Sequence, residues 1–375
     1  MPGLLRDVDP DGLLEYSVVF SDRALNHMSE AFLRVMQDIS RTLKSTYGAH
    51  SAIVVPGSGT FGMEAVARQF ATGKRCLVVR NGWFSYRWTQ IFDACDIPSE
   101  SRVLKASATE PGENPAFAPP AVAEVVATIH EYRPEVVFAA HVETASGIML
   151  PDDYVRSIAD AVHAVGGLMV LDCIASGAIW VDMRDVHVDV LLSAPQKGWS
   201  ASACCGLVML GAEARAHVEA ARSTSFACDL REWLRVMEAY EKGAHAYYAT
   251  MPTDCLKILG NAMRETEAYG FDRVRRAQQR LGDAVRALLR ERGFKGVAAT
   301  GFEAPSVVVS YTTDDDIRSG RKFADAGLQV AAGVPLACDE SSGFKTFRIG
   351  LFGLDKLHGV DRTVDALARA IDRIG

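Results

Sequence analysis

Short apolar runs alternate with helical patterns through the middle of the chain, and this alternation restricts the possible folds more than any other feature. The strand-like runs are Ala52–Val55, Cys76–Val79, Val136–Ala140, Leu168–Leu171, Val188–Leu192 and Gly206–Leu210. The helical patterns between them include Gly62–Phe70, Val122–Glu131 and Asp152–Val165. Such alternation predicts an α/β fold with a mostly parallel sheet wrapped by helices. Because these sheets bind ligands at the carboxyl ends of their strands, polar residues that follow the runs are the candidates for function.

The pattern changes after about Met251. A long helical stretch is expected over residues 256–293, broken near Gly270, followed by strand-like Ser306–Tyr311, a helix near 315–326, strand-like Thr346–Leu351 and a final helix from Val360. A chain of 375 residues is long enough for two domains with separate cores. We therefore predict an N-terminal arm over residues 1–22, a large cofactor-binding domain over residues 23–255 and a smaller C-terminal α+β domain over residues 256–375.

Composition and charge exclude several classes of protein. The formal charge is 40 − 47 = −7, which disfavours nucleic acid and anionic membranes as partners. No apolar run reaches the roughly 18 residues that span a bilayer, and the first residues carry acids where a secretion signal has a basic and then a long apolar stretch. The eight cysteines include no CxxC pair, so a reduced, cytoplasmic protein is expected. The nine histidines do not cluster with cysteines at ligand spacing, and no metal site is predicted.

The segment VVPGSGT at 54–60 combines the end of a strand, a Gly/Ser turn and the start of a helix. Free backbone N–H groups and the positive end of the helix would face an anion there, and Ser58 and Thr60 add hydroxyl donors. Taken alone, the turn could equally be an ordinary helix cap. It is neither GxGxxG nor a GK[ST] loop, so nucleotide binding is disfavoured.

An acid and a lysine follow two later strands. Asp172 closes the run LMVLD, and Lys197 follows the next run in the turn SAPQKGW, 197 − 172 = 25 residues on. Each has an ordinary alternative, a turn aspartate and a solvated loop lysine. Together with the phosphate-type turn they suit pyridoxal phosphate, which needs a Schiff-base lysine, an acid at its ring nitrogen and a cradle for its phosphate.

Six segments in the same order extend this match along almost the whole chain. They are PGSGTFGMEA (56–65), NGWFSYRW (81–88), HVETASGIMLP (141–151), LDCIASGAIWVD (171–182), SAPQKGW (193–199) and FRIGLFG (347–353). On these segments the chain resembles the class V aminotransferases, which are fold-type I pyridoxal-phosphate enzymes. The family includes alanine–glyoxylate, serine–glyoxylate and 2-aminoethylphosphonate–pyruvate transaminases. The resemblance implies a ping-pong transfer of an amino group from a small amino acid to glyoxylate or pyruvate.

The resemblance also implies roles for particular residues. Lys197 and Asp172 match the catalytic pair. The positions that match cofactor contacts are Ser58, Gly59, Thr60, Phe84, Thr144, Gln196, Tyr247 and Thr250. Phe84 matches the aromatic that stacks on the ring, with Trp83 as the alternative after a slip of one residue. Tyr247 and Thr250 match positions that reach the phosphate from a neighbouring subunit, which implies a homodimer with shared sites.

Arg348, in FRIG, matches the arginine that binds the substrate carboxylate, and its planar guanidinium suits bidentate binding. A structural salt bridge is the ordinary alternative for this residue. The chain departs from the family in its N-terminal segment LEYSVVFSDRALNHMS, which lacks the usual PGP and leaves the wall of the substrate pocket undefined.

Three other functions remain as alternatives. The first is a class V lyase or cysteine desulfurase, for which His141 would stack on the ring and Cys338 would be the loop nucleophile. The second is a 2-aminoethylphosphonate–pyruvate transaminase, whose phosphonate would need extra cationic donors. The third is a non-enzymatic binding protein on the same fold, which the joint presence of the lysine, acid, turn and arginine disfavours.

Overall fold

A seven-stranded sheet forms the centre of the molecule in the computed structural model, which describes residues 8–374. Its strand order is β1-β11-β10-β9-β6-β2-β3. The strands are β1 (Ser51–Pro56), β11 (Cys205–Leu210), β10 (Val190–Ser193), β9 (Leu168–Asp172), β6 (Val136–Ala140), β2 (Arg75–Arg80) and β3 (Glu100–Lys105). Only β11 runs antiparallel to its neighbours. The predicted α/β fold with a mostly parallel sheet is confirmed, and each strand-like run lies within one of these strands apart from the start of Val188–Leu192.

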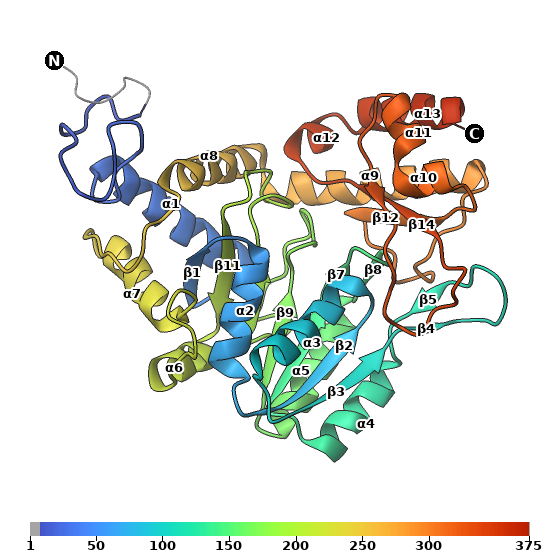
Figure 1. Cartoon of the computed structure of the whole chain (residues 1–375), viewed down its shortest axis with the longest axis horizontal. Helices are drawn as coiled ribbons and strands as arrows, with labels where there is room; N and C mark the ends of the chain where they lie inside the picture. The colour runs from blue at the N-terminus through green and yellow to red at the C-terminus, as the bar shows by residue number, and fades with distance from the viewer. Residues whose placement is uncertain (1–7, 375) are drawn as a thin grey trace.

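Helices cover both faces of this main sheet (Figure 1). The helices are α1 (Glu30–Tyr47), α2 (Gly59–Phe70), α3 (Trp83–Cys95), α4 (Val122–Tyr132), α5 (Asp152–Ala164), α6 (Ala212–Ala220) and α7 (Leu230–Glu241). The chain moves in one direction across the sheet through α2 and α3 and returns through α4 and α5. Because parallel crossovers are right-handed, these two pairs lie on opposite faces.

Two facing glycines bring α2 close to the sheet. A Cβ on Gly62 would lie 3.2 Å from the Cα of Gly206 in β11, and a Cβ on Gly206 would lie 2.7 Å from the Cα of Gly62. The missing side chains let the backbone of the helix rest directly on the strand. This contact fixes the position of the N-terminus of α2, where the candidate phosphate turn lies.

A three-stranded antiparallel sheet forms the second part of the structure, in the order β12-β14-β13 (Figure 1). Its strands are β12 (Val307–Tyr311), β14 (Thr346–Gly350) and β13 (Ala331–Ala332). Helix α8 (Thr253–Tyr269) packs on α1 of the first part, and the helices of the second part are α9 (Phe271–Glu291), α10 (Asp315–Ser319), α11 (Arg321–Asp325), α12 (Leu354–His358) and α13 (Val360–Ile374). Two small ribbons, β4–β5 (Ser107–Ala108, Phe117–Ala118) and β7–β8 (Val142–Glu143, Ile148–Met149), complete the strands.

Several elements had no counterpart among the expected ones. The sequence indicated no helix at α1, α3, α6 or α7, and no strand at β3. Residues 8–22 of the predicted arm form turns and bends, and residues 1–7 of it lie outside the described residues. The expected break at Gly270 is the junction between α8 and α9. None of the helices within residues 8–374 combines the length and the apolar character that crossing a bilayer requires.

Candidate active site

Asp172 ends β9 at the carboxyl edge of the main sheet. Its backbone pairs with Leu192 of β10, the strand that leads to the Lys197 turn. The carboxylate is buried and accepts a hydrogen bond from the Ile174 N–H at 2.9 Å. Burial raises the pKa of Asp172 to about 6; the Ile174 N–H lowers it, the nearby Glu143 carboxylate raises it further, and Lys197 lowers it. A buried acid in this state would gain from a cationic partner.

Lys197 lies in the turn after β10 and is half-buried. Burial lowers its pKa, and the positive charge of Arg348 lowers it further, whereas Asp172 opposes both effects. The amine nitrogen lies 4.9 Å from the centre of the Phe352 ring. A lysine whose pKa is lowered in this way is suited to act as a nucleophile and base.

The predicted phosphate turn packs directly against both of these segments. A Cβ on Gly59 would lie 2.8 Å from Cδ1 of Ile174, just after Asp172, and 3.3 Å from Cβ of Ala194, just before the Lys197 turn. Ser58 is the N-cap of α2, yet its side chain makes no capping hydrogen bond. The free hydroxyl and the N-terminal N–H groups of α2 therefore remain available to an anion.

Two guanidinium groups lie close to the Phe84 ring. The Cζ of Arg348 lies 5.4 Å from the centre of its ring, and the Cζ of Arg87 lies 5.3 Å from it. The ring of Trp83 packs instead against Tyr86, at 5.4 Å between centroids. Because both arginines also influence the pKa of Lys197, the geometry favours Phe84 over Trp83 as the aromatic of the site.

Arg87 is a site residue that the sequence reasoning missed. Its Nη1 donates a hydrogen bond to Oγ1 of Thr60 at 3.2 Å, so it joins α3 to the phosphate turn. It lies one turn after Phe84 in NGWFSYRW, and that spacing was the signal that could have identified it. The site thus contains a second cation beside Arg348.

Arg348 lies in β14, and its guanidinium is held by the small sheet. Its Nε donates to the carbonyl of Ala332 in β13 at 2.8 Å. No salt bridge involves Arg348 among the described residues, so the ordinary alternative of a structural ion pair does not apply there. Burial lowers the pKa of Arg348, while Glu143 opposes the change. The two terminal nitrogens remain free to bind a carboxylate or another anion.

Glu143 is a second residue that the sequence reasoning missed. Its buried carboxylate accepts hydrogen bonds from the N–H of Phe84 (3.2 Å), Ser85 (2.8 Å) and Ala145 (2.9 Å), and from the Ser85 hydroxyl (2.7 Å). A Cβ at Gly82 would lie 2.6 Å from Cγ of Glu143. Glu143 therefore takes the place of the missing N-cap side chain of α3 and fixes the backbone that carries Phe84.

Other predicted residues are not brought to this cluster by the single chain. Tyr247 and Thr250 bond to each other at 3.1 Å between their hydroxyls, and the Tyr247 ring lies 5.5 Å from that of His27. Both belong to the exposed loop between α7 and α8. Thr144 is buried next to Glu143, and Gln196 is exposed next to Lys197; neither side chain has a hydrogen-bond partner among residues 8–374.

The residues offered for the lyase alternative are placed unfavourably for it. His141 is buried, its Nδ1 lies 2.7 Å from Oγ of Ser176, and burial lowers its pKa to about 4. It borders a hollow with Arg275 and Arg276 of α9, and neither Lys197 nor Asp172 lines that hollow. Cys338 is buried with its thiol on the Arg80 carbonyl, and burial raises its pKa to about 12. A buried thiol with a high pKa is a poor nucleophile.

The residues of the cluster fit pyridoxal phosphate. Ser58 and the start of α2 offer uncommitted donors for a phosphate. Asp172 offers a ring nitrogen a buried carboxylate that forms no salt bridge among residues 8–374. Phe84 supplies a flat aromatic surface, and Lys197 an amine of lowered pKa. The fold and this donor set define the class of protein, a fold-type I enzyme that depends on pyridoxal phosphate.

Comparison with known proteins gives the family. The model of the class-V aminotransferases matches residues 13–333. A 2-aminoethylphosphonate–pyruvate transaminase of Burkholderia ambifaria is 27% identical over 363 residues, covering 94% of this chain and 90% of the relative. Rat alanine–glyoxylate aminotransferase is 22% identical over 364 residues, covering 93% and 82%. The chain therefore belongs to the class V aminotransferase family and is a transaminase dependent on pyridoxal phosphate.

Solved structures agree on the fold. The alanine–glyoxylate aminotransferase of Nostoc sp. superimposes with a TM-score of 0.79 at 19% identity, covering 93% of this chain and 88% of that one. An aspartate aminotransferase of Thermus thermophilus gives a TM-score of 0.75 at 21% identity, covering 94% of each chain. At these identities the likeness bears on the fold alone.

Proposed function

We propose that this transaminase takes its amino group from a small donor with a strongly anionic end, of the 2-aminoethylphosphonate type, and passes it to pyruvate or glyoxylate. The supporting observation is the pair of guanidinium groups on Phe84, at 5.3 Å for Arg87 and 5.4 Å for Arg348. A phosphonate carries up to two negative charges and three oxygens, so two cations match it better than one. Several relatives that cover most of this chain carry the corresponding name.

A small amino acid such as alanine is the second candidate donor. Its carboxylate would bind Arg348 alone, and the rat relative and the Nostoc structure are named for alanine and glyoxylate. Arg87 would then be left to the phosphate turn, through its contact with Thr60 at 3.2 Å. The two donors therefore differ in what they require of Arg87.

In this proposal each residue of the cluster has a distinct task. Pyridoxal phosphate, when bound, would supply a ring that withdraws electrons from the substrate α-carbon. Lys197 would hold the cofactor and then, as base and acid, remove the proton from the α-carbon and deliver it to C4′ of the cofactor. Asp172 would hold the ring nitrogen in its protonated state, and Phe84 would cover the ring. Ser58, Gly59 and Thr60 would bind the phosphate, with Gln196 near the phosphate and Thr144 near the ring oxygen.

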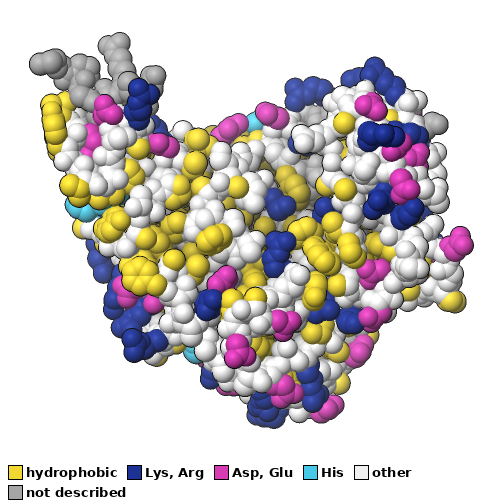
Figure 2. Space-filling model, in the orientation of Figure 1, with side chains coloured by type: hydrophobic (Ala, Val, Ile, Leu, Met, Phe, Trp, Pro, Cys, Tyr) yellow, Lys and Arg dark blue, Asp and Glu magenta, His cyan; other side chains and the backbone are white. Residues whose placement is uncertain are grey.

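The same proposal makes the enzyme a homodimer with shared sites. Large apolar side chains are exposed on the single chain, among them Phe61 beside the phosphate turn, Phe226, Tyr247 and Tyr16 (Figure 2 shows apolar groups spread across this face). A second subunit seated on this face would bury these side chains. Tyr247 and Thr250 would cross the interface to a partner's phosphate turn. The eight free cysteines suit the cytoplasm, which is the location we propose.

Half-reaction spectroscopy tests the proposed donor. The purified protein is mixed with 2-aminoethylphosphonate, alanine, serine or aspartate, and conversion of the cofactor to its amino form is followed by absorbance. We expect the phosphonate to give the highest ratio of rate to dissociation constant. Preference for alanine or serine by about tenfold or more would overturn the donor assignment. Release of sulfide from cysteine would instead support the lyase alternative.

A further inference from the structure

Arg80 is a buried cation at the carboxyl end of β2, just before the segment that begins α3. Its Nη2 donates to Oγ1 of Thr89 at 2.8 Å, and its Cζ lies 4.5 Å from the centre of the Tyr86 ring, both in α3. Its Nη1 donates to the carbonyl of Ala337 at 3.3 Å. One side chain thus contacts the helix of Phe84 and a loop of the small sheet.

The environment of Arg80 is unusual for a charged group. The side chain is 8% exposed, its Nε has no hydrogen-bond partner, and no carboxylate among residues 8–374 forms a salt bridge with it. Burial lowers its pKa. A buried guanidinium without a counter-ion is costly, and an apolar side chain of similar volume would serve packing better. A role in holding other groups in place would explain why an arginine occupies this position.

The loop that Arg80 binds connects β13, whose Ala332 carbonyl accepts a hydrogen bond from Arg348, to β14, the strand that carries Arg348. We call residues 333–345 the strap. Its turn is fixed by Glu340, whose carboxylate accepts from the N–H groups of Leu336, Ala337 and Cys338. Ala337 has φ +59°, a left-handed conformation that is unfavourable for alanine and that the Glu340 bonds stabilise. The turn therefore presents the Ala337 carbonyl to Arg80 as a rigid unit.

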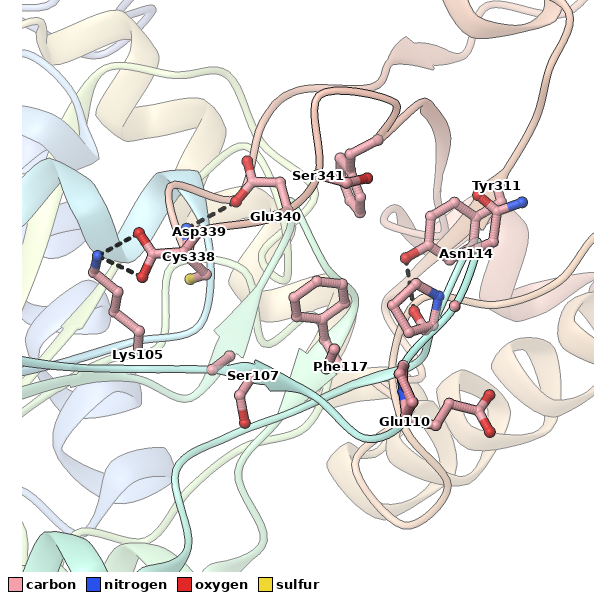
Figure 3. Close-up of a pocket in the computed structure, with 16 residues that line it drawn as sticks. Lys105, Ser107, Glu110, Asn114, Phe117, Tyr311, Cys338, Asp339, Glu340 and Ser341 are labelled. Atoms are coloured by element: carbon pink, nitrogen blue, oxygen red, sulfur yellow. Dashed lines mark hydrogen bonds and ion pairs between the residues drawn. The ribbon is translucent and has the colours of Figure 1, made fainter.

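Apolar contacts hold the strap against the rest of the molecule. Leu336 and Cys338 are buried in the core cluster beneath it, and the Phe344 ring packs on Phe117 and Tyr311. A cavity of about 470 Å³ lies between the strap and the β4–β5 ribbon. Figure 3 shows Phe117 and Tyr311 among the residues that line it.

At the near end of this cavity Lys105 pairs with Asp339 at 2.7 Å, an ion pair whose aspartate is largely exposed. Ion pairs at exposed positions contribute little to the free energy of folding. Arg80 adds a buried polar attachment, through its guanidinium and through its own carbonyl, which accepts from the Cys338 thiol at 3.4 Å.

We propose that Arg80 is a positioning residue that sets the separation between the two halves of the substrate site. On one side it holds α3, which carries Phe84 and Arg87. On the other it holds the strap five residues from Ala332, the carbonyl that binds Arg348 at 2.8 Å. The inference rests on the proposed roles of these arginines in substrate binding, and it adds a residue that touches neither substrate nor cofactor.

The test compares Arg80→Met with Arg80→Lys and with Arg75→Met, a control at the exposed start of the same strand. Two readouts are used on the holoenzyme: KM and kcat with pyruvate and glyoxylate as acceptors, and hydrogen–deuterium exchange without substrate. In Arg80→Met we expect KM to rise about tenfold, as for the loss of one charge-assisted hydrogen bond, with cofactor content unchanged. In the same variant, hydrogen–deuterium exchange should become faster in both segments, 81–90 and 334–345. Arg80→Lys should rescue incompletely because an ammonium lacks the planar fork.

A second variant protects the test against misfolding. Glu340→Gln loosens the strap from its other end, so it should raise KM in the same direction, and its effect should be less than additive with Arg80→Met. Unchanged KM in both variants, or faster exchange confined to segment 81–90, would overturn the inference. If the wild type converts neither acceptor with any donor, the proposed function fails, while the joint exchange response still decides whether Arg80 couples the strap to α3.

Discussion

The carboxylate of Glu143 binds the N–H of Phe84 at 3.2 Å, so an acid from one strand caps a helix that begins after another. The residue at the cap itself is Gly82, which leaves room for Glu143 to approach. This arrangement links β7 to the first turn of α3. It also puts a buried negative charge near Asp172 and Arg348, where it influences the pKa of each.

Replacing Glu143 with glutamine should therefore loosen the aromatic wall of the site. The amide keeps one acceptor oxygen where the carboxylate offers two, so at least one buried N–H of α3 loses its partner, at about 1–3 kcal/mol. We expect unfolding in urea to show this loss and the cofactor to bind more weakly. Glu131→Gln, at an exposed position of α4, is the matched control. Equal stability of both variants would contradict the capping role.

Asp172 predicts a pH dependence of stability with a definite sign. Its pKa is raised from 3.8 to about 6 in the folded chain, so the native state binds more protons than the unfolded state between these values. Without cofactor, its contribution to stability should therefore fall as pH rises from about 4 to 6, by roughly 3 kcal/mol in all. Asp172→Asn should lack this fall. Bound cofactor should reduce it in the wild type, because a ring cation favours the carboxylate.

The measurement is urea unfolding of the cofactor-free wild type and of Asp172→Asn at several pH values from 4 to 7. As pH rises across this window, the free energy of unfolding of the wild type should fall relative to that of Asp172→Asn. A difference that stays constant with pH would mean that Asp172 titrates normally in the folded chain. The variant should also bind the cofactor more weakly at every pH.

Much of the fold could be predicted because the relevant signals are local. The runs that became β6 and β9 are apolar for their whole length, as strands buried on both faces require. The helix α5 begins after Pro151 and ends before Gly166, which are ordinary start and stop signals. Once the strand order is known, the handedness of the crossovers determines the face on which each connecting helix lies.

Two of the residues that sequence reasoning missed, Glu143 and Arg80, depend on contacts between distant segments. Glu143 and Phe84 are 59 positions apart, and Arg80 and Ala337 are 257 apart. No local pattern distinguishes a capping glutamate or a buried arginine from an exposed one. Helix α3 was missed for a related reason, since its first residue follows a glycine and its cap comes from another strand. The predicted contacts of Tyr247 and Thr250 are with a second subunit, so the structure of a single chain does not contain them.

The two arginines on Phe84 should separate the donors. Arg87→Met should raise the dissociation constant for 2-aminoethylphosphonate about 10- to 100-fold, the loss expected for a charge-assisted contact, and should change that for alanine by less than threefold. Arg348→Lys should weaken the binding of both donors because an ammonium cannot form the two parallel hydrogen bonds of a guanidinium. Half-reaction titrations with each donor provide the constants. An equal effect of Arg87→Met on both donors would place this residue at the cofactor phosphate alone.

The shared site can be tested by mixing defective subunits. Lys197→Ala should lower kcat by about 10²- to 10⁴-fold, because proton transfer at the reacting carbon is lost. Thr250→Ala, combined with Tyr247→Phe, should weaken cofactor binding without altering Lys197.

A mixed dimer contains one chain of each defective kind. If the loop between α7 and α8 crosses to the partner, one site of this dimer would have both defects and the other site would be intact. Unfolding and refolding the two chains together should then restore roughly a quarter of wild-type activity, since half of the dimers are mixed and each has one intact site. Refolding each chain alone is the control. If each loop instead served its own subunit, every site in the mixture would keep one defect, and no activity would return.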